Sequence, residues 1–448
     1  MKPFRMLPVA HYKPLISLGI PIVVGQVGNM VLGFADTLMI GHYGMKELAA
    51  ASFVTNMTML VIIFSMGFSY GLTPLVGQLY GQGETHKIGR SVRAGMVANT
   101  LLAAALVTVS MVLYFCLPYV GLPPELLPYM RPYLLVNIVS LPFVCWLNTY
   151  KQFFDAIGHT RTPMMVILSG NVVNIVGNYL LIYGRCGCPE LGLVGAGLAT
   201  LFSRIGMSMA FVLIFFMAKP YRAYRDSFLR QGTDRQLLRR LNALGWPLAF
   251  QMSMEASAFS LVSVVVGWIG TQALAAHQIV MTLSQLFFMV YYGLAAAVSV
   301  RVSHFSGQRD YRSAYDTAAA GFHLVMLVAL LVALPFFLLR HEIGWLFTSD
   351  ESVCQLVSQL ALVIIVYQFG DGLQITYSNA LRGIACVKPL VYISFFSFFV
   401  TSLPLSWFLG IYLGYGLLGV WGAFPISLTI AGVLYYWRFK THIRSALS

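Results

Sequence analysis

Long apolar stretches separated by short polar connections recur from one end of the chain to the other. Each stretch is about 20 residues long, the length at which an α-helix crosses a hydrocarbon core of about 30 Å. We find twelve of them, six in each half, at residues 14–39, 48–74, 94–117, 130–150, 162–184, 193–217, 240–268, 274–300, 316–339, 354–380, 389–412 and 416–437. The pattern predicts an all-α polytopic membrane protein with about twelve transmembrane helices.

The two halves of the chain repeat each other. Gly41–Ala50 matches Gly267–Ala276 at an offset of 226 residues, and the last spans of the halves begin with similar sequences, Gly192–Ala196 and Gly419–Ala423. Each half has six spans and so begins and ends on the same side of the membrane, which makes the repeat parallel, as in some transporter folds. We therefore expect two six-helix lobes with substrate bound between them. The predicted parts are an amino-terminal lobe, a cytoplasmic linker and a carboxy-terminal lobe, at residues 1–220, 221–238 and 239–448.

Composition and charge agree with a membrane protein and predict its orientation. The chain of 448 residues is 58% hydrophobic and 10% charged, whereas an ordinary soluble protein is about 25% charged. Its net charge of +13 comes from Lys and Arg residues near the termini and in every second connection, the distribution of cytoplasmic loops. We expect a multi-pass protein of a bacterial inner membrane with both termini in the cytoplasm. Because the basic residues are scattered over short loops, a nucleic-acid partner is not expected.

Three carboxylates lie well inside the apolar spans, away from any basic residue of their own helix: Asp36, Glu255 and Asp371. A lone charge at the centre of a bilayer costs about 3 kcal/mol, so such residues usually mark ion or proton pathways. The repeat aligns Asp36 with Val262 and Glu255 with Asn29, so the acids are not part of the repeated scaffold. The alternative is a carboxylic acid that is permanently protonated and hydrogen-bonded within the bundle.

Polar side chains accompany the acid of the first half. Asn174 and Asn178, in a run that also holds Asn171, are four residues apart and therefore share a helix face. Ala196 and Thr200 are also four apart and could add a carbonyl and a hydroxyl group from the next helix. Such oxygens beside an acid suit a small hard cation. Hydrogen bonding between helices is the alternative.

The second half has a different polar set. Tyr367 and Asp371 share a helix face, and Gln278 can approach Glu255 from a neighbouring span. We expect a second cation site from Glu255, Tyr367 and Asp371, with Gln278 as a residue of the substrate cavity. Either set of acids could hold Na+, and either could carry a proton.

Other charged and reactive residues are less informative. Asp155 has Lys151 one helical turn away, which predicts a surface ion pair. Arg204 is a cation inside the sixth span and has no assigned role. Cys186 and Cys188 fall in an external turn, where they are either free or oxidised. The chain has neither a phosphate-binding loop nor a His-Glu-x-x-His motif, so nucleotide-driven transport and hydrolytic activity are not expected.

In their order along the chain, these residues resemble the multidrug and toxic compound extrusion (MATE) family, in particular its bacterial NorM-like branch. The similarity covers nearly the whole chain. It rests on Asp36, Met39–His42, Leu48–Ala50, Gly81–Gln82, Gly158–Pro163, Asn174, Asn178, Gly195–Ala196, Ala199–Thr200, Glu255, Ala276–Gln278, Gly307–Gln308 and Tyr367–Asp371.

The resemblance implies an exporter of organic cations, such as drugs and dyes, that is driven by inward flow of Na+ or H+. Two lobes would alternate the opening of a central cavity. In the family, one cation site corresponds to Asp36, Asn174, Asn178, Ala196 and Thr200, and NorM-like members also use acids that match Glu255 and Asp371, near Tyr367. The chain is then expected to be a monomer, to have no enzymatic activity and to need no cofactor except the coupling ion.

Two other functions stay open from the sequence. A flippase of lipid-linked saccharides from the same superfamily would need a basic cavity for a pyrophosphate group, whereas these lobes carry buried acids and only Arg204 as an embedded cation. A membrane receptor or channel scaffold would show no concentrative transport.

Overall fold

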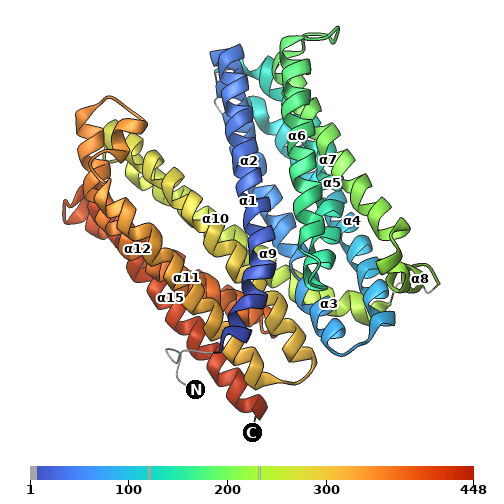
Figure 1. The fold of residues 1–448 in the computed structure, drawn as a ribbon. Coiled ribbons are helices and arrows are strands. Elements are labelled where there is room, and N and C mark those ends of the chain that lie inside the picture. The colour runs from blue at the N-terminus through green and yellow to red at the C-terminus, as the bar shows by residue number, and fades with distance from the viewer. Residues whose placement is uncertain (1–7, 120–122, 231, 233, 448) are drawn as a thin grey trace. The chain divides into compact units, whose positions relative to one another are not determined.

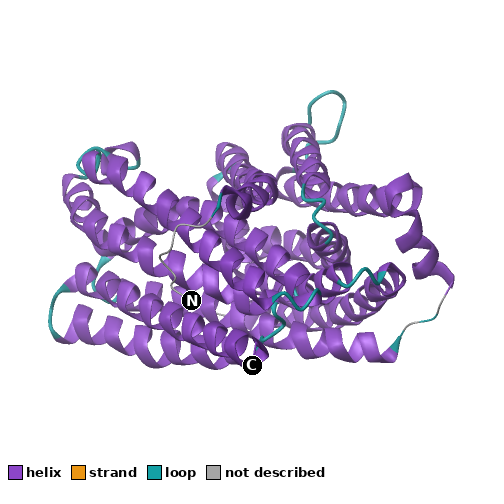
Figure 2. Cartoon of the chain, turned by 60° about the horizontal axis from the view of Figure 1, so that its bottom comes forward, coloured by secondary structure: helices purple, strands orange, loops and turns teal. Residues whose placement is uncertain are grey.

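The protein is almost entirely helical. The structure, a computed structural model, describes residues 8–119, 123–230, 232 and 234–447, and these residues contain no strand (Figure 2). Within that part of the chain, 12 helical stretches are long and apolar enough to cross a membrane. They coincide with the predicted spans, and six of them extend further at both ends. The predicted all-α polytopic fold is therefore confirmed.

The helices follow the repeat. Those of the first half are α1 (Val9–Tyr43), α2 (Met45–Ser69), α3 (Leu72–Gly81), α4 (Thr85–Cys116), α5 (Leu127–Ala156), α6 (Arg161–Tyr183), α7 (Gly192–Met217) and α8 (Arg222–Arg230). Those of the second half are α9 (Arg235–Gly267), α10 (Thr271–Gly307), α11 (Tyr311–Leu338), α12 (Glu351–Gly383), α13 (Lys388–Ser394), α14 (Leu403–Trp407) and α15 (Gly416–Leu447). Two π-helical segments, Phe395–Ser402 and Phe408–Tyr412, continue the eleventh span around α14.

Packing divides the chain into two compact units. The amino unit is Val24–Ala249, and the carboxy unit combines Met1–Val23 with Phe250–Ser448. The two boundaries are equivalent under the offset of 226 residues, and each follows a proline of its helix, Pro21 in α1 and Pro247 in α9. The first part of α1 therefore belongs to the carboxy unit, and the first part of α9 belongs to the amino unit. The lobe boundaries drawn from the repeat stay a prediction.

In the amino unit, α4, α5, α6 and α7 run side by side (Figure 1). Their apolar core includes Leu134 and Ile138 of α5. The predicted linker is partly folded, because α8 packs on α4. The Arg93 guanidinium donates to the Phe228 carbonyl at 3.1 Å, and Arg90 pairs with Asp234 at 2.6 Å. The linker thus belongs to the amino unit.

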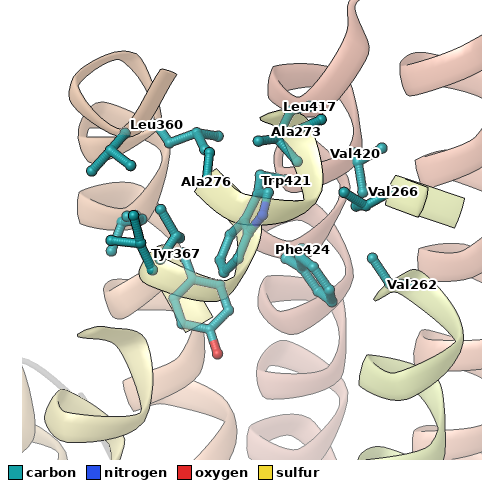
Figure 3. Close-up of a cluster of buried hydrophobic side chains, with 14 of the residues drawn as sticks. Val262, Val266, Ala273, Ala276, Leu360, Tyr367, Leu417, Val420, Trp421 and Phe424 are labelled. Carbon is teal, nitrogen blue, oxygen red and sulfur yellow. The ribbon is translucent and has the colours of Figure 1, made fainter. Parts of the chain in front are cut away.

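In the carboxy unit, α12 packs on both α10 and α15. The start of α1 and the end of α15 lie toward the same end of this unit (Figure 1). Its largest fully buried side chain, Trp421, lies with Tyr367 and Phe424 in an apolar cluster that α9 and α10 complete (Figure 3). We call this group the Trp421 cluster.

The structure corrects the alignment of the last spans. Gly192 and Gly416 are the first residues of α7 and α15, and both have left-handed backbones, with φ of 54° and 57°. Three residues later, Gly195 and Gly419 each pack against a backbone carbonyl of the preceding helix. Gly192 therefore corresponds to Gly416, and not to Gly419 as the sequence suggested. The sequence misled because Gly-x-x-Gly occurs twice in succession at the start of α15.

Candidate functional site

In the amino unit, the structure brings Asp36 together with the predicted amides. The Asn178 side-chain nitrogen donates to Asp36 Oδ1 at 2.5 Å and to Asn174 Oδ1 at 3.0 Å. Asn174 in turn donates to Thr200 Oγ1 at 3.1 Å, and Thr200 donates to the Ala196 carbonyl at 3.0 Å. One polar chain thus links α1, α6 and α7. We call these five residues the Asp36 site.

The Asp36 site still has free acceptors. Asn174 and Asn178 are completely buried, yet the Asn178 side-chain oxygen accepts no hydrogen bond from the described residues. The neighbouring Asn171 amide is buried as well, with neither of its polar atoms paired within the described chain. Buried polar groups are normally satisfied, because leaving one unpaired costs about 1–3 kcal/mol. Unpaired oxygens beside a carboxylate form an environment that a bound cation would complete.

In the carboxy unit, Glu255 is held by three donors. Its Oε1 accepts hydrogen bonds from Gln251 Nε2 at 3.0 Å, Gln374 Nε2 at 3.0 Å and Ser394 Oγ at 3.1 Å. These partners come from α9, α12 and α13, so Glu255 lies at a junction of helices. Hydrogen bonds to a carboxylate stabilise its ionised form. The three donors therefore offset part of the cost of placing a negative charge at Glu255.

Asp371 has the opposite environment. It is 4% exposed, and its Oδ2 has no hydrogen-bond partner among the described residues. It lies close enough to Glu255 for the two charges to interact. The ring of Tyr367, one turn earlier on α12, packs beside Trp421 at a centroid distance of 5.9 Å, and its hydroxyl points away from the Trp421 cluster (Figure 3). We call Glu255, Tyr367 and Asp371, with the three donors to Glu255, the Glu255–Asp371 site.

The expected approach of Gln278 to Glu255 is not seen, and its place in the substrate cavity stays a prediction. The Gln278 side chain is exposed and makes no hydrogen bond to Glu255 within the described chain. Sequence reasoning instead missed Gln251, Gln374 and Ser394. Two of these could have been found, because Gln251 is one turn from Glu255 and Gln374 is three residues after Asp371. No sequence signal singles out Ser394.

The predicted ion pair of Lys151 and Asp155 exists, but it does not lie on the surface. The two side chains are 2.9 Å apart, and they are only 14% and 7% exposed. The helical spacing indicated the pair correctly and could not reveal the burial, which comes from the packing of α5 against α4 and α7. In the turn between α6 and α7, Cys186 and Cys188 are free thiols.

The two units differ at the positions of the Asp36 site. Under the repeat, Asp36 corresponds to Val262, and the structural alignment of α7 with α15 places Val420 and Phe424 at the positions of Ala196 and Thr200. All three counterparts lie in the Trp421 cluster (Figure 3). The carboxy unit therefore fills this position with apolar side chains. Its acid, Glu255, lies seven residues earlier on the helix, about 10 Å along the axis.

Sequence comparison identifies relatives of this chain. A family model described as MatE matches residues 21–180 and 247–408. A protein from Mannheimia succiniciproducens, described as "Probable multidrug resistance protein NorM", is 30% identical over 437 residues, which cover 95% of this chain and 93% of the relative.

Solved structures share the fold. One is described as the outward-facing conformation of a multidrug resistance MATE family transporter of the MOP superfamily; it has a TM-score of 0.90 and 18% identity, with 97% of this chain and 96% of that chain covered. Another is described as a MOP superfamily transporter from Pyrococcus furiosus. It has a TM-score of 0.87 and 19% identity, and the match covers 98% of this chain and 97% of that chain. At these identities the similarity establishes the fold only.

Proposed function

Because the chain belongs to the MATE family of membrane transporters, in its NorM-like branch, we propose that it is a multidrug antiporter that exports lipophilic organic cations in exchange for inward Na+ or H+. The substrate cavity is exposed alternately to the two sides of the membrane. Binding of the coupling ion and binding of the drug favour different arrangements, and this exclusivity couples the two flows. The protein works in a bacterial inner membrane with both termini in the cytoplasm.

The observation that carries this proposal is the pair of carboxylates in the Glu255–Asp371 site. A buried and a half-buried carboxylate whose charges interact are costly to ionise together unless a cation lies beside them. Glu255 has three hydrogen-bond donors, whereas Asp371 Oδ2 has none among the described residues. Asp371 is therefore the group that binds and releases the exchangeable ion, and Glu255 supplies a constant negative charge.

The Asp36 site supports a second exchangeable ion. Its carboxylate faces amide and hydroxyl groups that can orient oxygen atoms toward Na+, or stabilise a proton on the acid. The unpaired oxygen of Asn178 is the feature of this site that favours a cation over a purely structural network.

The charge of these sites favours cationic over anionic substrates. Near Glu255 the only basic side chain whose charge reaches it, among the described residues, is Arg382. Two acids against one arginine leave a negative balance when both acids are ionised. A pyrophosphate group, which a flippase of lipid-linked saccharides would have to accommodate, is repelled by such a balance.

Transport in inverted membrane vesicles tests the proposal. A fluorescent organic cation is followed under an imposed Na+ gradient, an imposed H+ gradient or neither, for the wild type and for Asp36→Asn, Glu255→Gln and Asp371→Asn. We expect gradient-driven accumulation by the wild type, with the largest loss, tenfold or more, for Asp371→Asn.

The matched control is Glu125→Gln, because Glu125 is an exposed acid whose ion-pair partner within the described residues is Lys46, at 2.8 Å on the surface. This variant should transport like the wild type. If wild-type accumulation responds to neither ion gradient, the antiport proposal is wrong. If Asp371→Asn retains full coupling while Glu255→Gln loses it, the assignment of the two carboxylates is reversed.

A further inference from the structure

Arg204 is an embedded cation on the same face of α7 as two residues of the Asp36 site. Ala196, Thr200 and Arg204 follow one another at intervals of four residues, and residues four apart lie above one another on a helix. The span Gly192–Met217 contains no other charged residue. Arg204 is half-buried. A guanidinium inside a membrane helix requires a compensating partner.

The direct partner of Arg204 is neutral. Its Nη1 donates to Ser140 Oγ of α5 at 2.5 Å. Within the described chain, no carboxylate lies within the 4.0 Å of a salt bridge to Arg204. The acid whose charge it does interact with is Asp36. The guanidinium therefore acts on the charge of Asp36 without forming a direct ion pair with it.

Among the described residues, two ionisable groups interact with the charge of Arg204, the Tyr133 phenol and Asp36, and because a phenol is neutral at physiological pH, Asp36 is the counter-charge. On α5, the Tyr133 hydroxyl interacts with both Arg204 and Asp36. On α6, the side chains of the site are the neutral amides of Asn174 and Asn178. A coupling ion that binds at Asp36 therefore meets a resident positive charge.

We propose that Arg204 is a positioning residue of the Asp36 site, a tethered cation that offsets the charge of Asp36 when no coupling ion is bound and weakens ion binding enough for release. This inference rests on the proposed antiport. The physical reason is competition: a coupling cation and the guanidinium are attracted to one carboxylate and repel each other. Ser140 holds the guanidinium back from Asp36, so the site remains open to the ion.

The test measures ion binding through stability, so that inactive variants can also be used. Purified protein is melted over a series of NaCl concentrations with choline chloride as the balancing salt, and separately over a proton series without Na+. A ligand that binds only the folded state raises the melting temperature. For Arg204→Gln we expect the half-saturating concentration of the coupling cation to fall roughly tenfold, and for Arg204→Lys we expect it to stay near the wild-type value.

Two further variants separate electrostatics from packing. In the Asp36→Asn background, Arg204→Gln should no longer change the half-saturating concentration, because the shared counter-charge is gone. Ser140→Ala should weaken cation binding, since it frees the guanidinium to approach Asp36. Because Ser140→Ala leaves Arg204 in place, it tests the same competition even if Arg204→Gln does not fold.

The inference is overturned if the half-saturating concentration of the coupling cation is the same in the wild type, Arg204→Gln and Ser140→Ala. Arg204 would then have only a packing role through Ser140. That outcome differs from failure of the proposed function. If the wild type responds to neither Na+ nor H+, antiport itself is wrong. If it responds through Asp36 while the arginine variants do not shift the response, only the role of Arg204 is wrong.

Discussion

Replacing Gly195 with alanine should damage the Asp36 site without touching any of its side chains. At Gly195, α7 packs against the backbone of α6, and an added Cβ would lie 2.6 Å from the Leu181 carbonyl carbon and 3.1 Å from the Ile182 nitrogen. Ordinary contact begins at 3.4 Å, and the Leu181 carbonyl oxygen would be nearer still, so the two backbones must separate by at least about 0.8 Å. Because both neighbours are backbone atoms, no side-chain rotation can relieve the clash. Such overpacking costs about 1–3 kcal/mol.

The separation acts on a bond that joins the same two helices. Asn174 of α6 donates to Thr200 of α7 at 3.1 Å. If the helices part by about 0.8 Å at this level, the distance passes the roughly 3.5 Å beyond which a hydrogen bond is lost. The polar chain that positions the Asn178 amide at Asp36 is then broken on one side. We expect a lower melting temperature and weaker cation-dependent stabilisation together.

Gly206→Ala is the matched control, because it makes the same substitution on the same helix where an added Cβ meets nothing within 4 Å. Both variants are melted with and without Na+, and at several pH values, and their drug transport is compared in vesicles. Gly195→Ala should fall below the control in all three measurements. If the two variants are indistinguishable, the close approach of α6 and α7 does not position the site and the reasoning fails.

Three further predictions follow the same physical rules. Gly419→Ala on α15 would place a Cβ 2.6 Å from a carbonyl carbon of the preceding segment, so it should lower the melting temperature. Gly422→Ala is the control, because its Cβ meets nothing within 4 Å. Equal melting temperatures of the two variants would contradict this. Hydrogen bonds from the side chain and backbone of Ser313 lower the pKa of Asp310, which caps α11. The stabilisation is present above the pKa of Asp310 in the unfolded chain, near pH 4, and is lost as the pH falls through its lower pKa in the folded protein. Asp310→Ala should thus lower the free energy of unfolding by about 1 kcal/mol at pH 7, and its difference from the wild type should vanish when both are melted in acid. Asp310→Asn should keep the cap and lose the pH dependence. A loss in Asp310→Ala that does not change with pH would contradict this. Gly89→Ala would bring a Cβ to 2.8 Å from a backbone nitrogen of α8, so tryptic cleavage in the linker should become severalfold faster, and an unchanged rate would show that α8 is not held by α4.

The sequence was sufficient for the fold because the bilayer imposes a strong and simple constraint. Apolar runs of fixed length predicted the 12 membrane helices, and the offset of 226 residues predicted two equivalent halves. It could not predict that packing divides the chain at Val23 and Ala249, inside continuous helices. Nothing in the local sequence distinguishes a helix that stays in one unit from a helix that contributes to both.

The candidate sites were predictable to the extent that helical spacing determines contact. The pairs Asn174 with Asn178 and Ala196 with Thr200 lie on shared faces, and the structure links all four to Asp36. Contacts between helices distant in the sequence were not predictable in this way. Ser394 reaches Glu255 across 139 residues, and only the three-dimensional packing brings them together.

The difference between the two units gives the duplication a functional reason. A faithful repeat would place an acid at the position of Asp36 in both units, but the carboxy unit has Val262 there, packed with Val420 and Phe424 in the Trp421 cluster. An apolar cluster excludes water and ions, so in the proposed antiporter the cation of this unit binds at Glu255, two helical turns away, and at Asp371. The two repeats share one scaffold, and under the proposed antiport they would hold their ions in unlike surroundings: an acid beside an arginine in one, and an acid beside a second acid in the other. Sites with such different charge balance differ in ion affinity, so one unit can load or release its ion at a concentration where the other does not, and two identical repeats could not separate these events.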